Sequence, residues 1–400
     1  MLDSLKVLLK LLSTNILVAI LSFSLTIYLA SIIGPELYGK YAFSMILGLF
    51  CAQYVVFSTE ATGRFLKNTM GDERAFNAVS FLRLIHFFVI LIFSALLTFK
   101  YDFEIILGMI AVAIAGLNSS YIYEWKHEQA KYSVVFLIEK IIYISSAFVF
   151  LYFFDVKNIY FLFLIMLLVT LSSCYFQYNY IGVYKVSFNF SDVIFVFKNN
   201  YMMYLTALLT FVYGGYGRIL IGEGYGMAML GLFSAAWQMV FIITMFNSQI
   251  VRIWRGRIAD SVFKKDSNDL LLNIKTYLVY CVVPVLIFSL ILFFFSDLFF
   301  SMLFSDKYVD SAKMVKFLSP YFVIITLEFL SVMLWSSVSD RKINLILYAV
   351  FSIVTFIIMH IGVKFLTIYE FILIIPIMHG FCVFTSLVFF GYKLRNLNEK

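Results

Sequence analysis

The chain has 400 residues, of which 63% are hydrophobic and 13% are charged, and its formal net charge is +7. A soluble protein of this length would have to expose far more apolar surface than soluble monomers carry, and a disordered chain would be much more polar. The composition therefore excludes a soluble enzyme and a disordered chain and leaves an integral membrane protein. Excess Lys and Arg is typical of the cytoplasmic loops of membrane proteins, so the charge does not indicate nucleic-acid binding.

Apolar segments recur along the whole chain, and each is long enough to cross a bilayer core of about 30 Å as a helix. Their continuous apolar character differs from the alternating pattern of barrel strands, so the spans are predicted to be α-helical. Gly34-Pro35 ends the first span. The sequence predicts twelve spans, over residues 14–33, 41–62, 77–98, 105–123, 134–153, 159–179, 201–222, 227–250, 275–296, 317–338, 343–363 and 370–390.

The predicted spans fall into two six-helix lobes, residues 1–185 and residues 201–400. Residues 186–200 lie at the midpoint and carry apolar side chains at helical spacing, so we expect them to form a cytoplasmic linker that lies on the membrane surface. Lys and Arg in the segments on the side of the N-terminus outnumber those on the other side by more than two to one. The positive-inside rule then places both termini in the cytoplasm.

The two halves share a weak sequence match at a shift of 192 residues. Gly34 then aligns with Gly226, and Gly39 with Gly231, at the loop that leads into the second span of each half. Internal duplication is common among transporter folds. The halves are therefore predicted to be parallel repeats.

Several motifs resemble one family. Gly34-Pro35-Glu36-Leu37-Tyr38-Gly39-Lys40-Tyr41, followed by Glu60 and Arg64-Phe65-Leu66, resembles the amino-terminal signature of bacterial polysaccharide repeat-unit (O-antigen, Wzx-type) flippases. These belong to the multidrug/oligosaccharidyl-lipid/polysaccharide exporter superfamily. Arg218-Ile219-Leu220-Ile221-Gly222 in the second half also resembles this family. The chain departs from the family at Gly217, where many relatives have an acidic residue.

The resemblance implies an all-α integral membrane protein with about 12 transmembrane helices in two six-helix lobes around a central cavity. It also implies that the chain flips undecaprenyl-diphosphate-linked oligosaccharide from the inner to the outer leaflet of the bacterial cytoplasmic (inner) membrane by alternating access, for O-antigen, lipopolysaccharide or capsule assembly. The expected partners are this lipid-linked oligosaccharide, membrane lipids and other polysaccharide-assembly proteins, with no nucleic acid. We expect a carrier with no cofactor and no enzymatic activity.

Cations inside the predicted spans suit this substrate, because a diphosphate cannot cross hydrocarbon unpaired and the guanidinium fork binds phosphate bidentately. Arg218 follows three glycines in four positions, Gly214, Gly215 and Gly217, which we expect to act as a hinge. Arg64, Arg83 and Lys140 lie toward the inner ends of their spans. The sequence predicts that these four cations bind the diphosphate, although positions near the inner interface are equally typical of ordinary positive-inside anchors.

Four further ionisable residues are candidates for coupling or pairing. Glu328 lies mid-span and could bind H⁺ or Na⁺, pair with an arginine, or be hydrogen-bonded structurally. Glu60 is one turn before Arg64 and is expected to pair with it, whereas Glu139 and Lys140 point about 100° apart on a helix and need not pair. His379 could relay protons or be a core histidine. No group of residues has the spacing of metal ligands.

Two other functions remain open. A cation-coupled multidrug exporter of the same superfamily would favour acidic residues in its cavity, and the first predicted span has none. A polysaccharide polymerase would be expected to carry a large outer loop or acidic residues outside the bilayer, and neither is evident.

Overall fold

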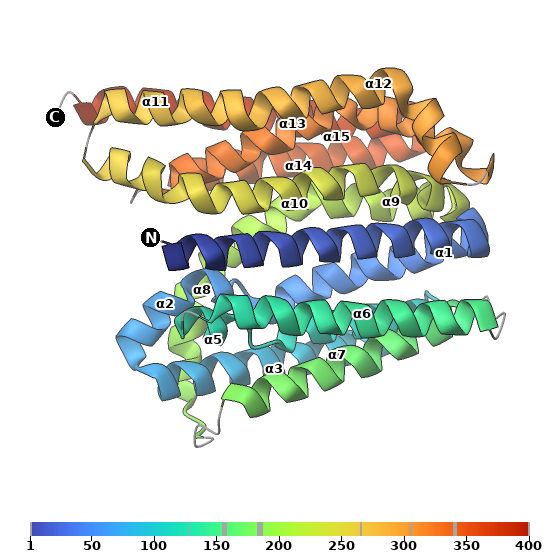
Figure 1. Cartoon of the computed structure of the whole chain (residues 1–400), viewed down its shortest axis with the longest axis horizontal. Helices are drawn as coiled ribbons and strands as arrows, with labels where there is room; N and C mark the ends of the chain where they lie inside the picture. The colour runs from blue at the N-terminus through green and yellow to red at the C-terminus, as the bar shows by residue number, and fades with distance from the viewer. Residues whose placement is uncertain are drawn as a thin grey trace. The chain divides into compact units, whose positions relative to one another are not determined.

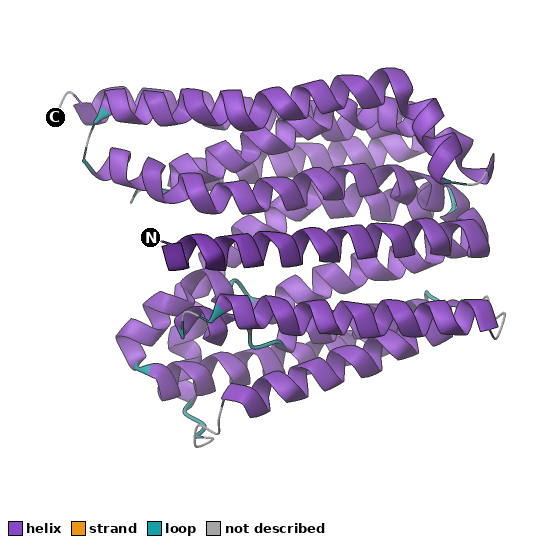
Figure 2. Cartoon of the chain, in the orientation of Figure 1, coloured by secondary structure: helices purple, strands orange, loops and turns teal. Residues whose placement is uncertain are grey.

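The computed structural model describes residues 2–126, 128–153, 158–181, 187–264, 266–304, 306–338 and 342–398. All regular elements within these ranges are helices (Figure 2), as predicted for an all-α membrane protein. The chain divides into two compact units: Met1–Ile33 with Lys40–Leu208, and Gly34–Gly39 with Leu209–Lys400.

The helices of the first unit are coloured blue to green in Figure 1. They are α1 (Leu2–Val56), α2 (Thr59–Met70), α3 (Asp72–Leu97), α4 (Phe103–Ala113), η1 (Ile114–Leu117), α5 (Ser120–Trp125), α6 (Gln129–Phe153), α7 (Ile159–Ile181) and most of α8 (Phe190–Phe211).

The second unit begins near the end of α8 and runs to the C-terminus. Its helices are η2 (Val212–Tyr216), α9 (Gly217–Gly224), α10 (Met227–Phe263), α11 (Ser267–Tyr277), η3 (Leu278–Val282), α12 (Val283–Leu303), η4 (Asp306–Tyr308), α13 (Val309–Ser336), α14 (Lys342–Phe365) and α15 (Ile368–Asn398).

The described residues contain 11 helical segments that are long and apolar enough to cross a membrane. The first, Leu17–Val56, has 40 residues. At 1.5 Å per residue it would measure about 60 Å, twice the bilayer core. Gly34 has non-helical angles (φ 76°, ψ 171°) and divides α1 into two helices, and in Figure 1 the chain runs out along one and returns along the other. These correspond to the first two of the twelve predicted spans.

Large apolar side chains cover the outside of the helices. Ile92, Phe294 and Ile361 are examples of residues whose side chains are mostly exposed, and each comes from a different predicted span. Exposed apolar surface on this scale is unfavourable in water and favourable in hydrocarbon. The chain is therefore a multi-pass membrane protein.

Polar side chains join neighbouring helices within the apolar second unit. Asn247 on α10 donates to Thr326 on α13, with Nδ2 and Oγ1 2.9 Å apart. Ser289 on α12 donates to the Ser319 carbonyl on α13 at 2.5 Å. Hydrogen bonds of this kind hold helices together where no hydrophobic driving force acts between them. These hydrogen bonds join α10 and α12 to α13, the helix against which the candidate site is built.

The glycines aligned by the 192-residue shift occupy matching positions in the structure. Gly226, at the start of α10, has φ 92° and ψ 161°, close to the angles of Gly34. Such angles favour glycine, since other L-residues clash there. Gly39 and Gly231 pack closely within the second unit: a Cβ on Gly39 would overlap the Met227 carbonyl. The same local conformation thus recurs at the break before the second span of each half.

The midpoint of the chain differs from the predicted linker. Most of residues 186–200 form the first turns of α8, which continues through η2 and α9 to Gly224. Residue 186 lies outside the described residues. Val193 is buried, and Asp192 accepts hydrogen bonds from Arg74, with Oδ1 2.5 Å from Nη2. Val193 therefore packs inside the first unit while Phe190 and Phe197 are exposed, and the division into units falls inside the helix, after Leu208. The position of this segment on the membrane surface stays a prediction.

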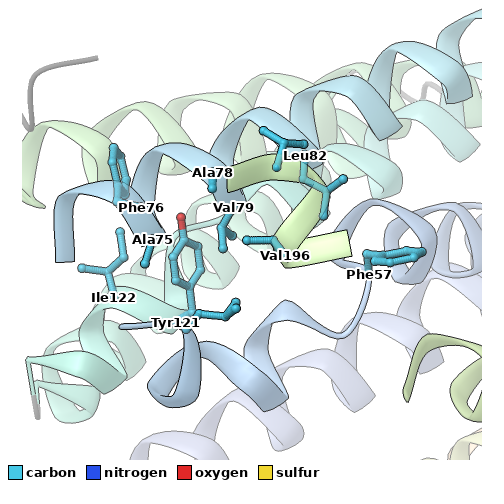
Figure 3. Packing of buried hydrophobic residues seen from close by; sticks show 11 residues of the cluster. Phe57, Ala75, Phe76, Ala78, Val79, Leu82, Tyr121, Ile122 and Val196 are labelled. Carbon is cyan, nitrogen blue, oxygen red and sulfur yellow. The ribbon is translucent and has the colours of Figure 1, made fainter. Parts of the chain in front are cut away.

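A buried cluster in the first unit explains this packing (Figure 3). Ala75, Val79 and Leu82 line one face of α3 and pack with Tyr121 of α5 and Val196 of α8. Helices separated by more than a hundred residues in sequence are thereby joined in one core.

We predict that Gly231→Ala destabilises the protein, because the added Cβ would overlap the Pro35 carbonyl, and backbone cannot move aside as a side chain can. Overpacking of this kind costs about 1–3 kcal/mol or more. Thermal unfolding of the purified protein in detergent measures the effect. Gly391→Ala on α15 is the control, because a Cβ there meets nothing within 4 Å. Equal unfolding temperatures for the two variants would contradict the role of the close backbone contact.

Candidate functional site

Arg218 lies at the start of α9, directly after a π-helical turn, Val212–Tyr216. The turn contains Gly214 and Gly215, two of the three glycines predicted to form a hinge. Arg218 Nε donates to the Gly214 carbonyl at 2.6 Å. Single π turns within helices are frequent at functional sites. Here the turn provides an acceptor that fixes one edge of the guanidinium.

The other edge of the Arg218 guanidinium has no acceptor among the described residues. The group stacks over the ring of Trp237 on α10, with Cζ 4.9 Å from the centroid. No carboxylate of the described residues lies within 4.0 Å of it. The side chain is half-buried. Arg218 is therefore held in place by one hydrogen bond and one aromatic face while its terminal N–H groups stay available.

Aromatic side chains lead from Arg218 into the second unit. Trp237 packs against Tyr321 of α13, with ring centroids 5.5 Å apart. Tyr321 is also close enough to Arg218 for electrostatic interaction, as is Tyr38. Tyr321 is buried, and its hydroxyl lies 3.1 Å from Nδ1 of His379 on α15. Tyr321 thus contacts both Trp237, on which Arg218 stacks, and His379.

His379 and Glu328 face each other at the far end of this row. His379 Nε2 lies 3.3 Å from Glu328 Oε1, within ion-pair distance, although the geometry is not that of an aligned hydrogen bond. The His379 side chain is 3% exposed and that of Glu328 20%. Tyr213 of the π turn stacks on His379, with centroids 4.5 Å apart and planes 10° apart. Two residues singled out separately in the sequence therefore form one pair.

The three glycines predicted as a hinge have different surroundings. A Cβ on Gly214 would lie 3.8 Å from Trp237, an ordinary contact, whereas a Cβ on Gly215 would overlap the ring of Phe211. Gly217 has tight but less severe contacts with Met359. The structure places a π turn at these glycines, and hinge motion stays a prediction.

Arg83 lies in the first unit and is fully buried. It donates four hydrogen bonds, two to Thr59 Oγ1 at 3.0 and 2.8 Å and one each to the carbonyls of Gly116 and Asn118 at 3.2 and 2.6 Å. Its guanidinium also stacks on Tyr121 at 4.6 Å. An arginine has five N–H donors, so at most one remains for a ligand. Arg83 joins the α1–α2 connection to the break between α4 and α5.

Glu60 lies beside this network. Its Oε1 accepts a hydrogen bond from Ser120 Oγ at 2.6 Å and is 3.9 Å from Arg83 Nη2. The sequence predicted a pair between Glu60 and Arg64, but the Arg64 side chain lies outside the described residues. The structure therefore assigns Glu60 a serine and a more distant arginine as neighbours.

Lys140 and Glu139 contact each other on α6, with Nζ 3.6 Å from Oε1. From the angle of about 100° between their positions on the helix, the two residues were not expected to need each other as partners. Long, flexible stems span the 100° between adjacent positions on the helix, and both side chains are partly buried, where pairing reduces the cost of charge. The lysine also lies over the Phe136 ring at 5.0 Å. Its charge is thus partly compensated within the helix.

Comparison with known proteins identifies the fold. No family model and no curated protein matches the sequence. Among solved structures, an inward-facing multidrug resistance MATE family transporter of the MOP superfamily matches with a TM-score of 0.71 at 12% identity, over 98% of this chain and 99% of the other. This chain has the MATE transporter fold.

Two further structures support the same fold. An outward-facing MATE transporter of the MOP superfamily matches with a TM-score of 0.57 at 13% identity. A MOP superfamily transporter from Pyrococcus furiosus, described as having a binding pocket of reverse polarity, matches at 0.59 and 12%. Each covers 99% of this chain and 97% of the other. These solved structures are described as members of the superfamily that includes the flippase family resembled by the sequence motifs.

The aromatic part of the site within this MATE fold was not predicted from the sequence. Trp237, Tyr321 and Tyr213 are indistinguishable by pattern from the many aromatic residues in the spans, and only the packing of α10, α13 and the π turn brings them together. No group of three metal-ligating side chains occurs among the described residues. Thus Arg218, His379 and Glu328 are the parts of the candidate site that the sequence singled out.

We predict that Arg83→Met destabilises the protein, because Thr59 and the carbonyls of Gly116 and Asn118 would lose their donor. Each buried acceptor left without a partner costs about 1–3 kcal/mol. The unfolding temperature in detergent should fall markedly, whereas the control Lys313→Ala, at an exposed ion pair, should leave it nearly unchanged. An Arg83→Met protein with normal stability and no transport would instead support the sequence prediction that Arg83 binds substrate.

Proposed function

We propose that the chain is a transporter that flips a polyprenyl-diphosphate-linked oligosaccharide, undecaprenyl-diphosphate in the bacterial case, from the inner to the outer leaflet by alternating access. The MATE fold supports a transporter, and the motifs around Gly34 and Arg218 support the flippase branch of the superfamily. In this proposal the chain is a carrier without a cofactor and without catalytic chemistry.

One observation carries the proposal: Arg218 presents unpaired guanidinium N–H groups inside the second unit. A charged residue within a span costs roughly 2.5–3.5 kcal/mol on insertion scales, so a cation without a carboxylate partner needs a compensating role. A diphosphate supplies the acceptors that the described residues do not. Trp237 and the Gly214 carbonyl hold the guanidinium in one orientation, which reduces the entropy lost when an anion binds.

The membrane potential can assist such a reaction. Moving negative charge outward from a negative interior gains about 2.3 kcal/mol per charge per 100 mV. The proposal places the protein in the bacterial inner membrane with both termini in the cytoplasm, since Lys and Arg are concentrated on that side of the sequence. It leaves a role for H⁺ or Na⁺ coupling and for association with other polysaccharide-assembly proteins.

A cation-coupled multidrug exporter is the second candidate. The structures of the same fold include multidrug resistance transporters. Glu328 favours this alternative, because a partly exposed carboxylate inside a span could attract a cationic drug. The cation at Arg218 argues against it, since it adds positive charge to a unit that would bind cations.

We predict that Arg218→Ala abolishes function, and that Arg218→Lys loses at least about tenfold, because lysine keeps the charge but lacks the planar fork and the stacking on Trp237. The measurement is surface polysaccharide in a strain whose chromosomal copy is deleted and replaced by each variant. Protein level in the membrane is quantified in parallel.

Lys364→Ala is the matched control, since it removes an exposed cation from the same unit. It should retain wild-type polysaccharide. Normal polysaccharide with Arg218→Ala would remove Arg218 from the mechanism. If deletion leaves polysaccharide unchanged but sensitises the cells to cationic drugs, and Glu328→Gln does the same, the exporter alternative replaces the flippase.

A further inference from the structure

The second unit contains a titratable pair whose connection to Arg218 suggests a specific form of coupling. We propose that His379 and Glu328 bind one proton together, and that Tyr321 transmits its presence to Arg218, so that the unit binds an anion more tightly when the pair is protonated. This inference rests on the proposed function, since it takes the diphosphate as the anion at Arg218.

The geometry gives His379 two distinct contacts. Nε2 faces the Glu328 carboxyl at 3.3 Å, and Nδ1 faces the Tyr321 hydroxyl at 3.1 Å. A neutral imidazole carries one N–H, whereas a protonated imidazole donates from both nitrogens. With Glu328 ionised, the facing carboxylate favours the neutral-ring proton on Nε2 by electrostatic attraction, since the two atoms are close without forming an aligned hydrogen bond. Nδ1 must then accept, and Tyr321 donates its hydroxyl proton to it.

Protonation reverses the role of Tyr321. Once Nδ1 carries a proton, it donates to the Tyr321 oxygen, and the tyrosine hydroxyl proton has to turn elsewhere. Tyr321 lies near enough to Arg218 for electrostatic interaction and packs on Trp237, the ring beneath the guanidinium. The released O–H can therefore donate to an anion held by Arg218. The proton thus adds both a charge and a hydrogen-bond donor.

The charges near the His379–Glu328 pair also favour tighter anion binding when the pair is protonated. With His379 neutral, the ionised Glu328 and Arg218 cancel, and the added proton leaves the group with one net positive charge. The other titratable side chains facing the pair are hydroxyls or a thiol that stay neutral at physiological pH, namely Tyr213 of η2, Tyr348 of α14 and Cys382 of α15. No further charge from these elements opposes the effect among the described residues.

Linkage makes the coupling reciprocal: a proton that strengthens anion binding is itself bound more tightly when the anion is present. The affinity for the anion should therefore rise as the pH falls. The slope cannot exceed one proton per anion, which is about tenfold in affinity per pH unit.

The test is equilibrium binding of tritiated farnesyl diphosphate to the full-length protein in lipid nanodiscs between pH 5.5 and 8.5, with empty nanodiscs subtracted. The protonation state of the probe changes with pH in the same way for every variant. A difference in pH dependence between variants therefore arises from the protein. We expect the wild type to gain several-fold more affinity toward low pH than His379→Gln. Tyr321→Phe keeps the ring and its packing but lacks the hydroxyl, and it should lose part of the same gain.

His360→Gln is the matched control, because His360 is exposed and lies 3.4 Å from the Tyr216 hydroxyl, away from Glu328. It should keep the wild-type pH dependence. Binding that depends on Arg218 but has the same pH dependence in the wild type, His379→Gln and Tyr321→Phe overturns the inference and leaves the proposed function standing. Absence of specific binding by the wild type at every pH overturns the proposed function and the inference together.

Discussion

A guanidinium enclosed by helices must find acceptors for its N–H groups, and this requirement governs both halves of the molecule. Arg83 satisfies it internally, with four hydrogen bonds and the face of Tyr121. Among the residues that the structure describes, Arg218 satisfies one donor, at the Gly214 carbonyl. The same residue type therefore has different surroundings in the two units: in the first it stabilises a broken helix, and in the second its terminal N–H groups have no acceptor among the described residues.

The positions of these arginines follow from helix irregularities. Arg83 donates to carbonyls that are accessible because the helix is interrupted between Ala113 and Ser120. Arg218 donates to a carbonyl of a π turn, where the regular hydrogen-bond pattern shifts by one residue. In both cases a departure from the α-helix provides an acceptor that a regular span would have used itself. Irregular backbone is tolerated at such depth where protein groups satisfy it.

Much of the fold could be predicted from sequence, because a span of apolar residues is a long and redundant signal. Gly34-Pro35 marked the first break in the sequence, and Gly226 was found as its counterpart through the 192-residue shift; both glycines have positive φ in the structure. The linker was less predictable: the period of residues 190–197 indicates a helix with an apolar face but not what covers that face. Val193 is covered by protein, while Phe190 and Phe197 remain exposed.

The candidate site was predictable only as a set of charges. Glu328 and His379 are 51 residues apart in the chain, and their pairing depends on how α13 and α15 pack, which no local pattern encodes. Sequence could likewise not separate Arg83 from Arg218, since the difference lies in the acceptors around each one.

The arrangement of charge in the second unit also bears on why an arginine and a carboxylate coexist there without contact. A direct Arg218–Glu328 ion pair would neutralise both groups and leave nothing to attract an anion. Trp237 stacks against the Arg218 guanidinium and packs on the buried Tyr321 ring, so aromatic side chains adjoin the cation in place of the carboxylate. Glu328 instead faces His379. Keeping the carboxylate away from Arg218 preserves the charge of the guanidinium, and the low dielectric of the unit makes that charge count for more than it would in water.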